Sequence, residues 1–322
     1  MIDKVDNIKF YIGPMSKNVV DSIIEFTEKI GNKIGFIPSR RQIEHDGGYV
    51  NNWTTGEFAK YVNGKVPIER DHAGAGQGHI DDDGYESLKA DCENVEIIHI
   101  DPWKKYSRYY KGLKQCISNI EFCYYTNRNI KFEVGTEEAI RKFSPTELNS
   151  LLSDLKAELL PEIFDNIIYV VVQSGVGLDL GKLKNTGTFN FNRLEKMIKI
   201  CKKFGKESKE HNGDYLANEE IKTRFDMGLD AINIAPEFGQ LETLCYLDEM
   251  GDDIDEYYNI CYESKRWKKW VGDDFIPEDN KKELIKICGH YVLTNKKFTS
   301  IKPDIDDKIK QVITNKLKEL VQ

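Results

Sequence analysis

Short apolar runs alternate with amphipathic stretches along most of the chain. The runs are rich in Ile, Val and Phe and stop at Gly, Pro or charged residues, a pattern typical of buried strands. They predict strands over residues 8–12, 33–37, 66–70, 95–100, 130–134 and 167–172. Between them, apolar residues recur every three to four positions, which indicates amphipathic helices. The predicted helices cover residues 19–30, 54–62, 82–92, 106–126, 145–159 (with Ser144 as the expected N-cap) and 192–203.

Residues 206–236 add a strand, a helix and another strand. A mostly polar run is predicted to be a strand from its position, and Ile221, Phe225 and Leu229 lie four residues apart on the apolar side of the next helix. Residues 231–235 form the last apolar run. The chain therefore contains eight strand–helix units in about 250 residues, the number found in a (β/α)8 TIM barrel of the α/β class. An open doubly wound sheet is the alternative, but no GxGxxG motif follows an early strand.

The character of the sequence changes near residue 250, after which Trp and Tyr stand among Lys and Arg. The barrel is therefore predicted to span residues 1–250, and residues 251–322 are predicted to form a helical C-terminal extension. We expect this extension to pack on the barrel as a covering layer; a lid is the alternative.

Composition limits the kinds of partner. The chain has 322 residues, 40% of them apolar, and can bury a large core. Its net charge of −8 argues against a nucleic-acid or membrane-surface protein, which would need a basic face. No apolar run approaches the ~20 residues of a membrane span, and the N-terminus lacks a signal-peptide pattern, so a cytoplasmic location is expected. The seven cysteines include no CxxC pair, which favours buried free thiols.

Polar side chains collect at the carboxyl ends of the predicted strands. Three of the six histidines lie at such ends: His72, His99 and His211. Carboxylates share these ends or occupy neighbouring ones: Asp71, Asp101, Glu133, Glu137 and Asp214. In a parallel barrel these ends meet on one rim, where the chemistry is housed. A divalent cation such as Zn²⁺ binds two or three imidazoles with a carboxylate or water, so the pattern indicates a metal site; hydrogen-bonded core histidines are the alternative.

The loops after strands six to eight are rich in small residues. Residues 174–177, 212–213 and 236–239 can place backbone N–H groups or a helix start against an anion. The alternative is that these glycines only turn the chain. Basic pairs at residues 40–41 and 104–105 are candidates for binding a second anionic end of a ligand.

Several of these segments together resemble the class II, metal-dependent ketose-bisphosphate aldolases. Residues 69–74, Glu-Arg-Asp-His-Ala-Gly, are similar to the Asp-His segment of that group. Residues 132–137, Phe-Glu-Val-Gly-Thr-Glu, look like its Glu-Leu-Gly stretch. Residues 210–213 and 232–235 resemble its His-Gly-Gly and Ile-Asn-Ile strands.

The similarity is closer to the GatZ/KbaZ-like branch, the non-catalytic subunit family of class II D-tagatose-bisphosphate aldolase. Residues 42–49 match its Gln-x-x-x-x-Gly-Gly-Tyr stretch, and residues 171–176 match its Val-Val-Gln-x-Gly-Val. Residues 209–215 match its Glu-x-His-x-x-Asp-Tyr, with Lys209 in place of the leading glutamate. The resemblance covers residues 8–250.

The resemblance implies a retro-aldol reaction on a phosphorylated ketose that depends on a divalent metal, expected to be Zn²⁺. It implies that His72 and His211 hold the cation, with Glu133 as a further ligand. It also implies that Asp71 moves the proton of the substrate hydroxyl and that Glu137 is a second acid or base.

Substrate recognition is assigned to the strand ends and the loops that follow them. Asn233 and the loop at residues 174–177 would bind a phosphate end. The predicted substrate-binding residues are Gln42, Arg40, His99, Asp101, Gln173, Ser174, Gly175, Asn212, Gly213 and Asn233.

One departure from the aldolase pattern keeps alternatives open. Catalytic class II aldolases carry a histidine after strand six, where this chain has Gln173, a weaker zinc ligand. A metal-dependent ketose epimerase and a non-catalytic subunit that stabilises an aldolase are therefore alternatives to the lyase. Schiff-base chemistry would need a buried lysine, for which Lys131 and Lys209 are candidates. The expected partners are a sugar-phosphate substrate, further copies of the chain and, for a silent subunit, a separate aldolase chain; neither nucleic acid nor a membrane is expected.

Overall fold

The computed structural model describes residues 7–31 and 34–321 of the chain. Lys33, the predicted first residue of the second strand, lies outside these ranges. In the described part of the chain, no helix is long and apolar enough to cross a membrane. All seven cysteines are buried free thiols, which confirms that prediction.

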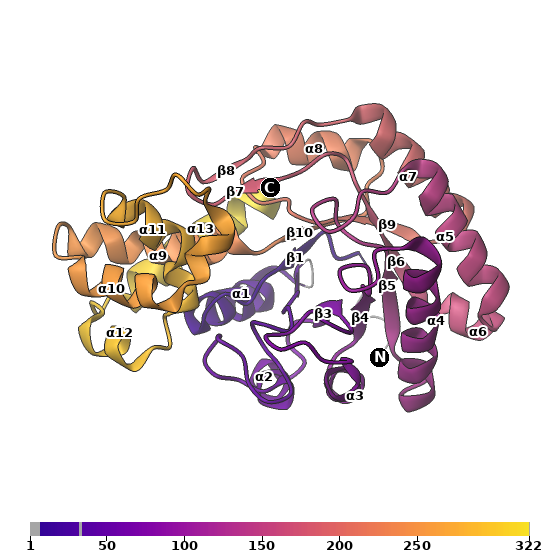
Figure 1. The fold of residues 1–322 in the computed structure, drawn as a ribbon, viewed down its shortest axis with the longest axis horizontal. Coiled ribbons are helices and arrows are strands. Elements are labelled where there is room, and N and C mark those ends of the chain that lie inside the picture. The colour runs from indigo at the N-terminus through magenta and orange to yellow at the C-terminus, as the bar shows by residue number, and fades with distance from the viewer. Residues whose placement is uncertain (1–6, 32–33, 322) are drawn as a thin grey trace.

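Eight parallel strands form one sheet (Figure 1). They are β1 (Phe10–Ile12), β2 (Ile34–Phe36), β3 (Glu69–Ala73), β4 (Ile97–Ile100), β5 (Lys131–Val134), β6 (Ile167–Val172), β9 (Glu207–Glu210) and β10 (Ala231–Ile234). Their order is β2-β1-β10-β9-β6-β5-β4-β3. Isolated parallel bridges from Phe36 to Ile68 and from Ser39 to Asp71 join the two edges of this sheet. The sheet therefore closes on itself, which confirms the predicted (β/α)8 barrel.

Helices alternate with the strands and cover the outside of the barrel (Figure 1). They are α1 (Lys17–Ile30), α2 (Thr55–Val62), α3 (Tyr85–Asn94), α4 (Tyr109–Thr126), α5 (Pro145–Glu158), α6 (Pro161–Asp165), α7 (Phe191–Lys203), α8 (Asn218–Asp226) and α9 (Pro236–Met250). Capping boxes fix the starts of α2 and α5. The hydroxyls of Thr54 and Ser144 each accept a hydrogen bond from the backbone N–H of a glutamate three residues on, and the side chain of that glutamate accepts one from the backbone N–H of the Thr or Ser. The predicted N-cap at Ser144 is confirmed.

β3 begins later than predicted, so that Asp71 and His72 lie inside the strand. Its pairing with β4 shifts between Arg70 and Ala73, and the φ angle of His72 is 46°. Consecutive residues of a regular strand point to opposite faces, whereas this bulge brings Asp71 and His72 into one cluster. The strained backbone therefore serves the placement of two polar side chains.

Three other local predictions differ from the structure. α8 ends at Asp226, so Leu229, expected on its apolar side, lies beyond the helix; Gly228, with a φ angle of 94°, separates the two. α6 was not predicted. Nor was the hairpin formed by β7 (Leu178–Asp179) and β8 (Lys184–Asn185), because strands of two residues carry no periodic signal.

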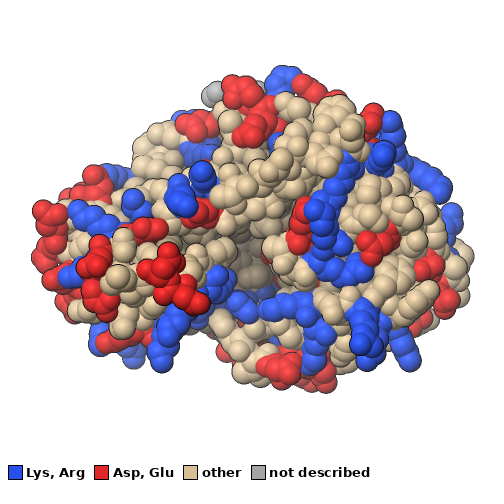
Figure 2. Space-filling model, turned by 45° about the horizontal axis from the view of Figure 1, so that its top comes forward, with Lys and Arg blue, Asp and Glu red and all other residues tan. Residues whose placement is uncertain are grey.

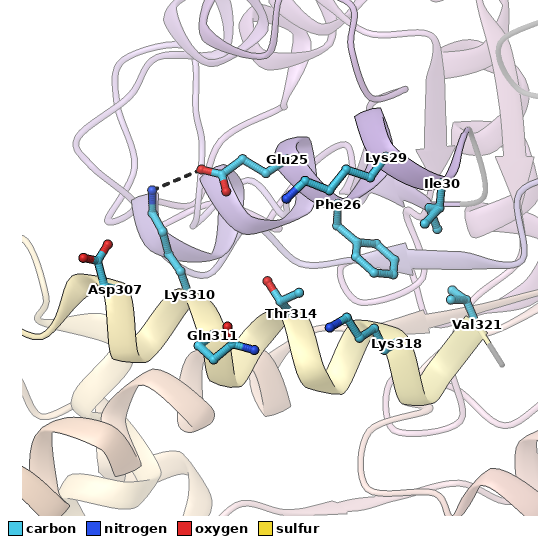
Figure 3. A pocket seen from close by; sticks show the side chains of 10 residues that line it. All are labelled: Glu25, Phe26, Lys29, Ile30, Asp307, Lys310, Gln311, Thr314, Lys318 and Val321. Carbon is cyan, nitrogen blue, oxygen red and sulfur yellow. Dashed lines mark hydrogen bonds and ion pairs between the residues drawn. The ribbon is translucent and has the colours of Figure 1, made fainter.

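The C-terminal segment is helical. It contains α10 (Asp255–Ser264), η2 (Arg266–Trp270), α11 (Lys281–Cys288), η3 (Gly289–Tyr291), α12 (Lys296–Ile301) and α13 (Asp306–Val321). α13 lies alongside α1 (Figure 3), where Lys310 Nζ is 3.3 Å from Glu25 Oε1. The side chains of Ile309 and Leu317 on α13 are buried. η2 and η3 instead contribute side chains to a cavity at the carboxyl ends of the strands.

Candidate active site

A cavity of about 720 Å³ opens at the carboxyl ends of the barrel strands. Figure 2 shows a hollow between the C-terminal helices and the barrel, with Lys and Arg side chains at its edge. Side chains at the ends of β3, β9 and β10 line the floor of the cavity. The loops after β2 and β4, together with η2, supply its rim.

Four side chains on the floor have the ligand types of a metal site. They are Asp71, His72, His99 and His211, here called the floor cluster, and their candidate ligand atoms all lie within 4.8 Å of one another. Asp71 Oδ1 is 3.5 Å from His72 Nε2, 3.6 Å from His99 Nδ1 and 3.7 Å from His211 Nδ1. Three imidazoles and one carboxylate are a donor set that suits a divalent transition-metal ion.

Hydrogen bonds outside the cluster fix the tautomers of two imidazoles. His72 Nδ1 lies 2.6 Å from Asp101 Oδ2, and His99 Nε2 lies 3.2 Å from the carbonyl oxygen of Gly135. Carboxylate and carbonyl oxygens accept hydrogen bonds, so we assign the proton to these two nitrogens. The opposite nitrogens, His72 Nε2 and His99 Nδ1, then face Asp71. The backbone N–H of His72 donates to His99 Nδ1 at 3.3 Å, in agreement with that tautomer.

Glu133 orients the third imidazole and connects it to the interior of the barrel. Its Oε1 accepts from His211 Nε2 at 3.2 Å, which leaves His211 Nδ1 facing Asp71. Its Oε2 is 3.0 Å from Lys209 Nζ, which also lies 2.5 Å from Glu69 Oε2. Burial raises the pKa of Glu133, but Lys209, His211 and a second histidine outweigh burial and hold that pKa well below its usual range. Glu133, expected as a further metal ligand, therefore lies behind the floor cluster and contacts His211.

The electrostatics of the floor cluster favour a bound cation. Burial raises the pKa of Asp71, but its three histidines lower it to about 2. Burial lowers the pKa of His72, but Asp71 and further carboxylates raise it to about 10. Asp71 Oδ1 is buried without a hydrogen-bond donor. An orphaned carboxylate oxygen that faces three imidazole nitrogens is the arrangement expected where a cation takes the place of protons and completes the site.

The structure brings most of the predicted site residues together. Those that line the cavity are Asp71, His72, His211, Glu137, Gln42, Asn212 and Asn233. His99, predicted to contact substrate, lies in the floor cluster, and Asp101, also predicted to contact substrate, lies behind His72. Besides His99 and Asp101, five predicted substrate-binding residues do not line the cavity: Arg40, Gln173, Ser174, Gly175 and Gly213.

Arg40 is engaged in ion pairs beside the cavity. Its guanidinium lies 2.5 Å from Glu44 Oε2 and 2.6 Å from Asp82 Oδ2, and its side chain is 1% exposed. Because both carboxylates already bind it, Arg40 is not available to a ligand. The next residue, Arg41, lines the cavity instead.

Gln173 supports the loop between β5 and α5. Its amide nitrogen donates to the carbonyl oxygens of Thr136 and Arg141 at 2.7 and 2.9 Å, and its oxygen accepts from Phe143 N at 2.8 Å. These bonds hold its side chain away from the floor cluster. His99, on β4, provides the third imidazole in its place.

The start of α9, a predicted anion site, is occupied by a side chain of the protein itself. Asp214 Oδ1 accepts from Ala235 N at 3.0 Å and from Glu237 N at 2.8 Å. Burial, with the nearby charge of Glu237, raises the pKa of Asp214 to about 8. In the neighbouring loop, Ser174 N donates to Glu210 Oε1 at 2.8 Å. Several of the backbone donors expected to bind a phosphate are therefore already bound.

Cationic side chains gather at the cavity mouth, and four of the six were not predicted to bind a ligand. The six are Arg41, Lys104, Lys265, Arg266, Lys268 and Lys269, here called the cationic rim. Arg41 and Lys104 were noted as candidates for an anionic end, but the segment 265–269 was expected to belong to a covering layer. Its alternation of Lys and Arg with Trp is the signal that marks it in the sequence.

The two lysines considered for Schiff-base chemistry do not line the cavity. Lys209 is bound between two buried carboxylates, and Lys131 Nζ donates to Asn166 Oδ1 at 2.7 Å. A Schiff-base lysine needs a neutral amine that reaches the substrate. Neither lysine reaches the cavity.

Comparison with known proteins identifies structures of the same fold. No protein-family profile and no curated protein sequence matches the chain. A probable tagatose 6 phosphate kinase from Sinorhizobium meliloti 1021 is similar over 97% of this chain and 98% of its own, with 14% identity and a TM-score of 0.71. The YdjI aldolase from Escherichia coli K12 is similar over 98% and 91%, with 11% identity and a TM-score of 0.57. The fructuronate-tagaturonate epimerase UxaE from Cohnella laeviribosi is similar over 98% and 81%, with 11% identity and a TM-score of 0.64.

These likenesses extend over the C-terminal helices as well as the barrel, because they cover nearly the whole chain. At such low identity they show a shared fold. The resemblance to the GatZ/KbaZ-like branch stays a prediction.

Proposed function

We propose that the protein is a metal-dependent lyase of the aldolase type that cleaves a phosphorylated ketose. The observation that carries this proposal is the floor cluster, in which three imidazole nitrogens surround a buried carboxylate oxygen without a donor. His72, His99 and His211 would hold the cation, which we expect to be Zn²⁺. When bound, the cation would supply a Lewis acid for the ketose carbonyl and the enediolate.

Asp71 would act as the base in the cleavage direction. Its lowered pKa keeps the carboxylate ionised at neutral pH, and it lines the cavity. It would take the proton of the hydroxyl two carbons from the carbonyl carbon. The bond between that hydroxyl-bearing carbon and the carbon next to the carbonyl then breaks, an aldehyde leaves, and the electron pair stays on the carbonyl fragment as an enediolate.

Glu137 would return a proton to that fragment. Its Oε2 accepts from Asn212 Nδ2 at 2.6 Å and lies 3.9 Å from His72 Nε2, so the carboxyl group stands beside the floor cluster. Asn233 would bind a substrate oxygen, because both polar atoms of its amide are buried without a partner in the described structure. Gln42, on the cavity wall, is a further candidate for a substrate hydroxyl.

Epimerisation of the same class of substrate is the second candidate. Asp71 and Glu137 lie 3.5 and 3.9 Å from the same nitrogen, His72 Nε2. If the released aldehyde rotates between these two groups and the enediolate adds to its other face, the configuration of the carbinol carbon is inverted. The structural likeness to an epimerase supports this candidate as much as the likeness to an aldolase supports the first.

The test is metal content combined with product analysis. The protein is purified alone, its metal is measured, and ketose phosphates are supplied before and after chelation. We expect about one divalent ion per chain and turnover that chelation removes. Two fragments indicate a lyase and an isomer indicates an epimerase. A chain without metal or turnover, active only with a separate aldolase subunit, would contradict both and support a silent subunit.

A further inference from the structure

We propose that the cationic rim is a binding site for a single terminal phosphate, so that the substrate is anionic at one end only. The inference rests on the proposed function for the ketose part of the ligand. The phosphate site itself follows from the charges and contacts around the cavity mouth.

The cationic rim lacks partners of opposite charge. Within the described residues, none of its six side chains lies within ion-pair distance of a carboxylate. The neighbours Lys104 and Lys105 show the contrast. Lys105 is outside the cavity and lies 2.6 Å from Asp81 Oδ1, whereas Lys104 lines the cavity without an ion pair.

The rim cations also crowd one another. Burial, and then the charges of Arg41, Lys104 and Arg266, lower the pKa of Lys269 to about 8. Burial and the charge of Arg41 lower the pKa of Lys104. Like charges brought together and partly desolvated are costly unless an anion neutralises them. A phosphate monoester carries nearly two negative charges at neutral pH and accepts several hydrogen bonds at once.

Aromatic side chains hold part of this rim in place. The guanidinium of Arg266 lies 5.2 Å from the ring centre of Tyr49 and 5.3 Å from that of Tyr291. Lys269 Nζ lies 4.3 Å from the ring centre of Trp270. Such cation–π contacts position the cations without neutralising them. The rim is therefore a preformed site with free hydrogen-bond donors.

Among the described residues, the other side of the cavity has no comparable site. Asp214 already caps α9, and Glu237 beside it pairs with Lys316 at 2.6 Å. Arg224 is bound to Glu210 at 2.8 Å. Every Lys and Arg that lines the cavity belongs to the cationic rim. A ketose with a phosphate at each end would therefore place one phosphate against groups that are already satisfied.

Binding to the zinc-loaded protein tests the proposal by calorimetry. The probes are inorganic phosphate, a ketose 1-phosphate, a ketose 6-phosphate, the 1,6-bisphosphate and a hexuronate. We expect one of the monophosphates to bind within about threefold of the bisphosphate. Lys269→Met and Lys104→Met should each weaken its binding by about tenfold or more, whereas Lys105→Met should leave it unchanged.

Three results would overturn the proposal. The bisphosphate could bind a hundredfold more tightly than either monophosphate, the rim variants could bind phosphate as the wild type does, or the hexuronate could bind more tightly than both monophosphates. The last result would assign the rim to a carboxylate. Circular dichroism of each variant confirms that it is folded, and Lys269→Arg should restore most of the binding.

The same experiments distinguish a failure of the phosphate site from a failure of the proposed function. Phosphate binding that follows the prediction without any turnover would reject only the lyase and epimerase proposals. Metal-dependent turnover that is indifferent to Lys104 and Lys269 would reject only the phosphate site.

Discussion

On the floor of the cavity every imidazole is held by a carboxylate or carbonyl oxygen, whereas on its rim no cation is paired with a carboxylate in the described structure. The floor gathers negative charge around three ring nitrogens and has room for a cation. The rim gathers positive charge and has room for an anion. Both regions are preorganised, since hydrogen bonds orient the floor and aromatic rings support the rim. The comparison indicates a ligand whose reacting carbonyl and anionic end are bound by different elements of the chain.

Removing an imidazole from the floor should have the largest effect. His99→Ala, like His72→Ala and His211→Ala, should weaken metal binding by at least about a hundredfold and abolish turnover while the protein folds. The readout is metal content after dialysis, with circular dichroism for folding. His45→Ala is the control, because that side chain is 33% exposed and pairs with Glu44. Full metal content in any of the three variants would remove that histidine from the site.

Weakening the support of an imidazole should have a smaller effect on the same readout. In Asp101→Asn the partner of His72 Nδ1 loses its charge, and we expect metal affinity to fall by about 10- to 100-fold. A competition titration against a coloured chelator measures the change. Asp81→Asn, an exposed carboxylate paired with Lys105, should bind metal like the wild type. Equal affinities in the two variants would show that Asp101 does not act through His72.

The rim should respond to pH. The pKa of Lys269 is lowered to about 8 in the absence of ligand, and a bound anion would raise it. Phosphate binding is then coupled to proton uptake, and its affinity should fall by up to about tenfold per pH unit above pH 8. Calorimetry at a series of pH values in Lys269→Met should show a flatter profile. A wild-type affinity that is constant from pH 7 to pH 10 would contradict the account.

Gln173 should affect stability and leave the floor unchanged. Gln173→Ala removes four hydrogen bonds, one of them from Arg193, and should lower the free energy of unfolding by about 1–3 kcal/mol without loss of metal. Denaturant unfolding and metal analysis are the two measurements. Gln311→Ala, on the exposed surface of α13, should change neither. Loss of metal in Gln173→Ala would show that Gln173 contributes to the metal site and would contradict this prediction.

The barrel could be predicted because most strands carry two signals, an apolar run and the polar or small residue that stops it, whereas β9 was predicted from its position. β6, the most apolar run, has the predicted bounds Ile167–Val172. The bounds of β3 were predicted wrongly because its bulge places Asp71 and His72 within the strand, whereas two consecutive polar residues are typical of a loop. Tertiary placement of charged residues therefore overrides the local pattern at the site itself.

The floor was predicted more completely than the rim. His72, His99 and His211 each lie near the carboxyl end of a different strand, and the closure of a barrel brings such ends together whatever their separation in sequence. His99 was assigned to the substrate because the resemblance directed attention to the residue after β6, whereas the structure places it in the floor cluster. The rim joins Arg41 and Lys104 to Lys269, and no periodicity predicts that a short 3-10 helix after the barrel returns to its mouth.

The most direct test of the account is the coordination of zinc in the loaded wild-type protein and in His99→Ala, measured by X-ray absorption. The account predicts about one ion per chain, bound by three imidazole nitrogens at about 2.0–2.1 Å with oxygen completing the shell, and loss of this signal in the variant. Zinc that is absent, or bound by fewer than three imidazoles and unchanged in His99→Ala, would contradict it.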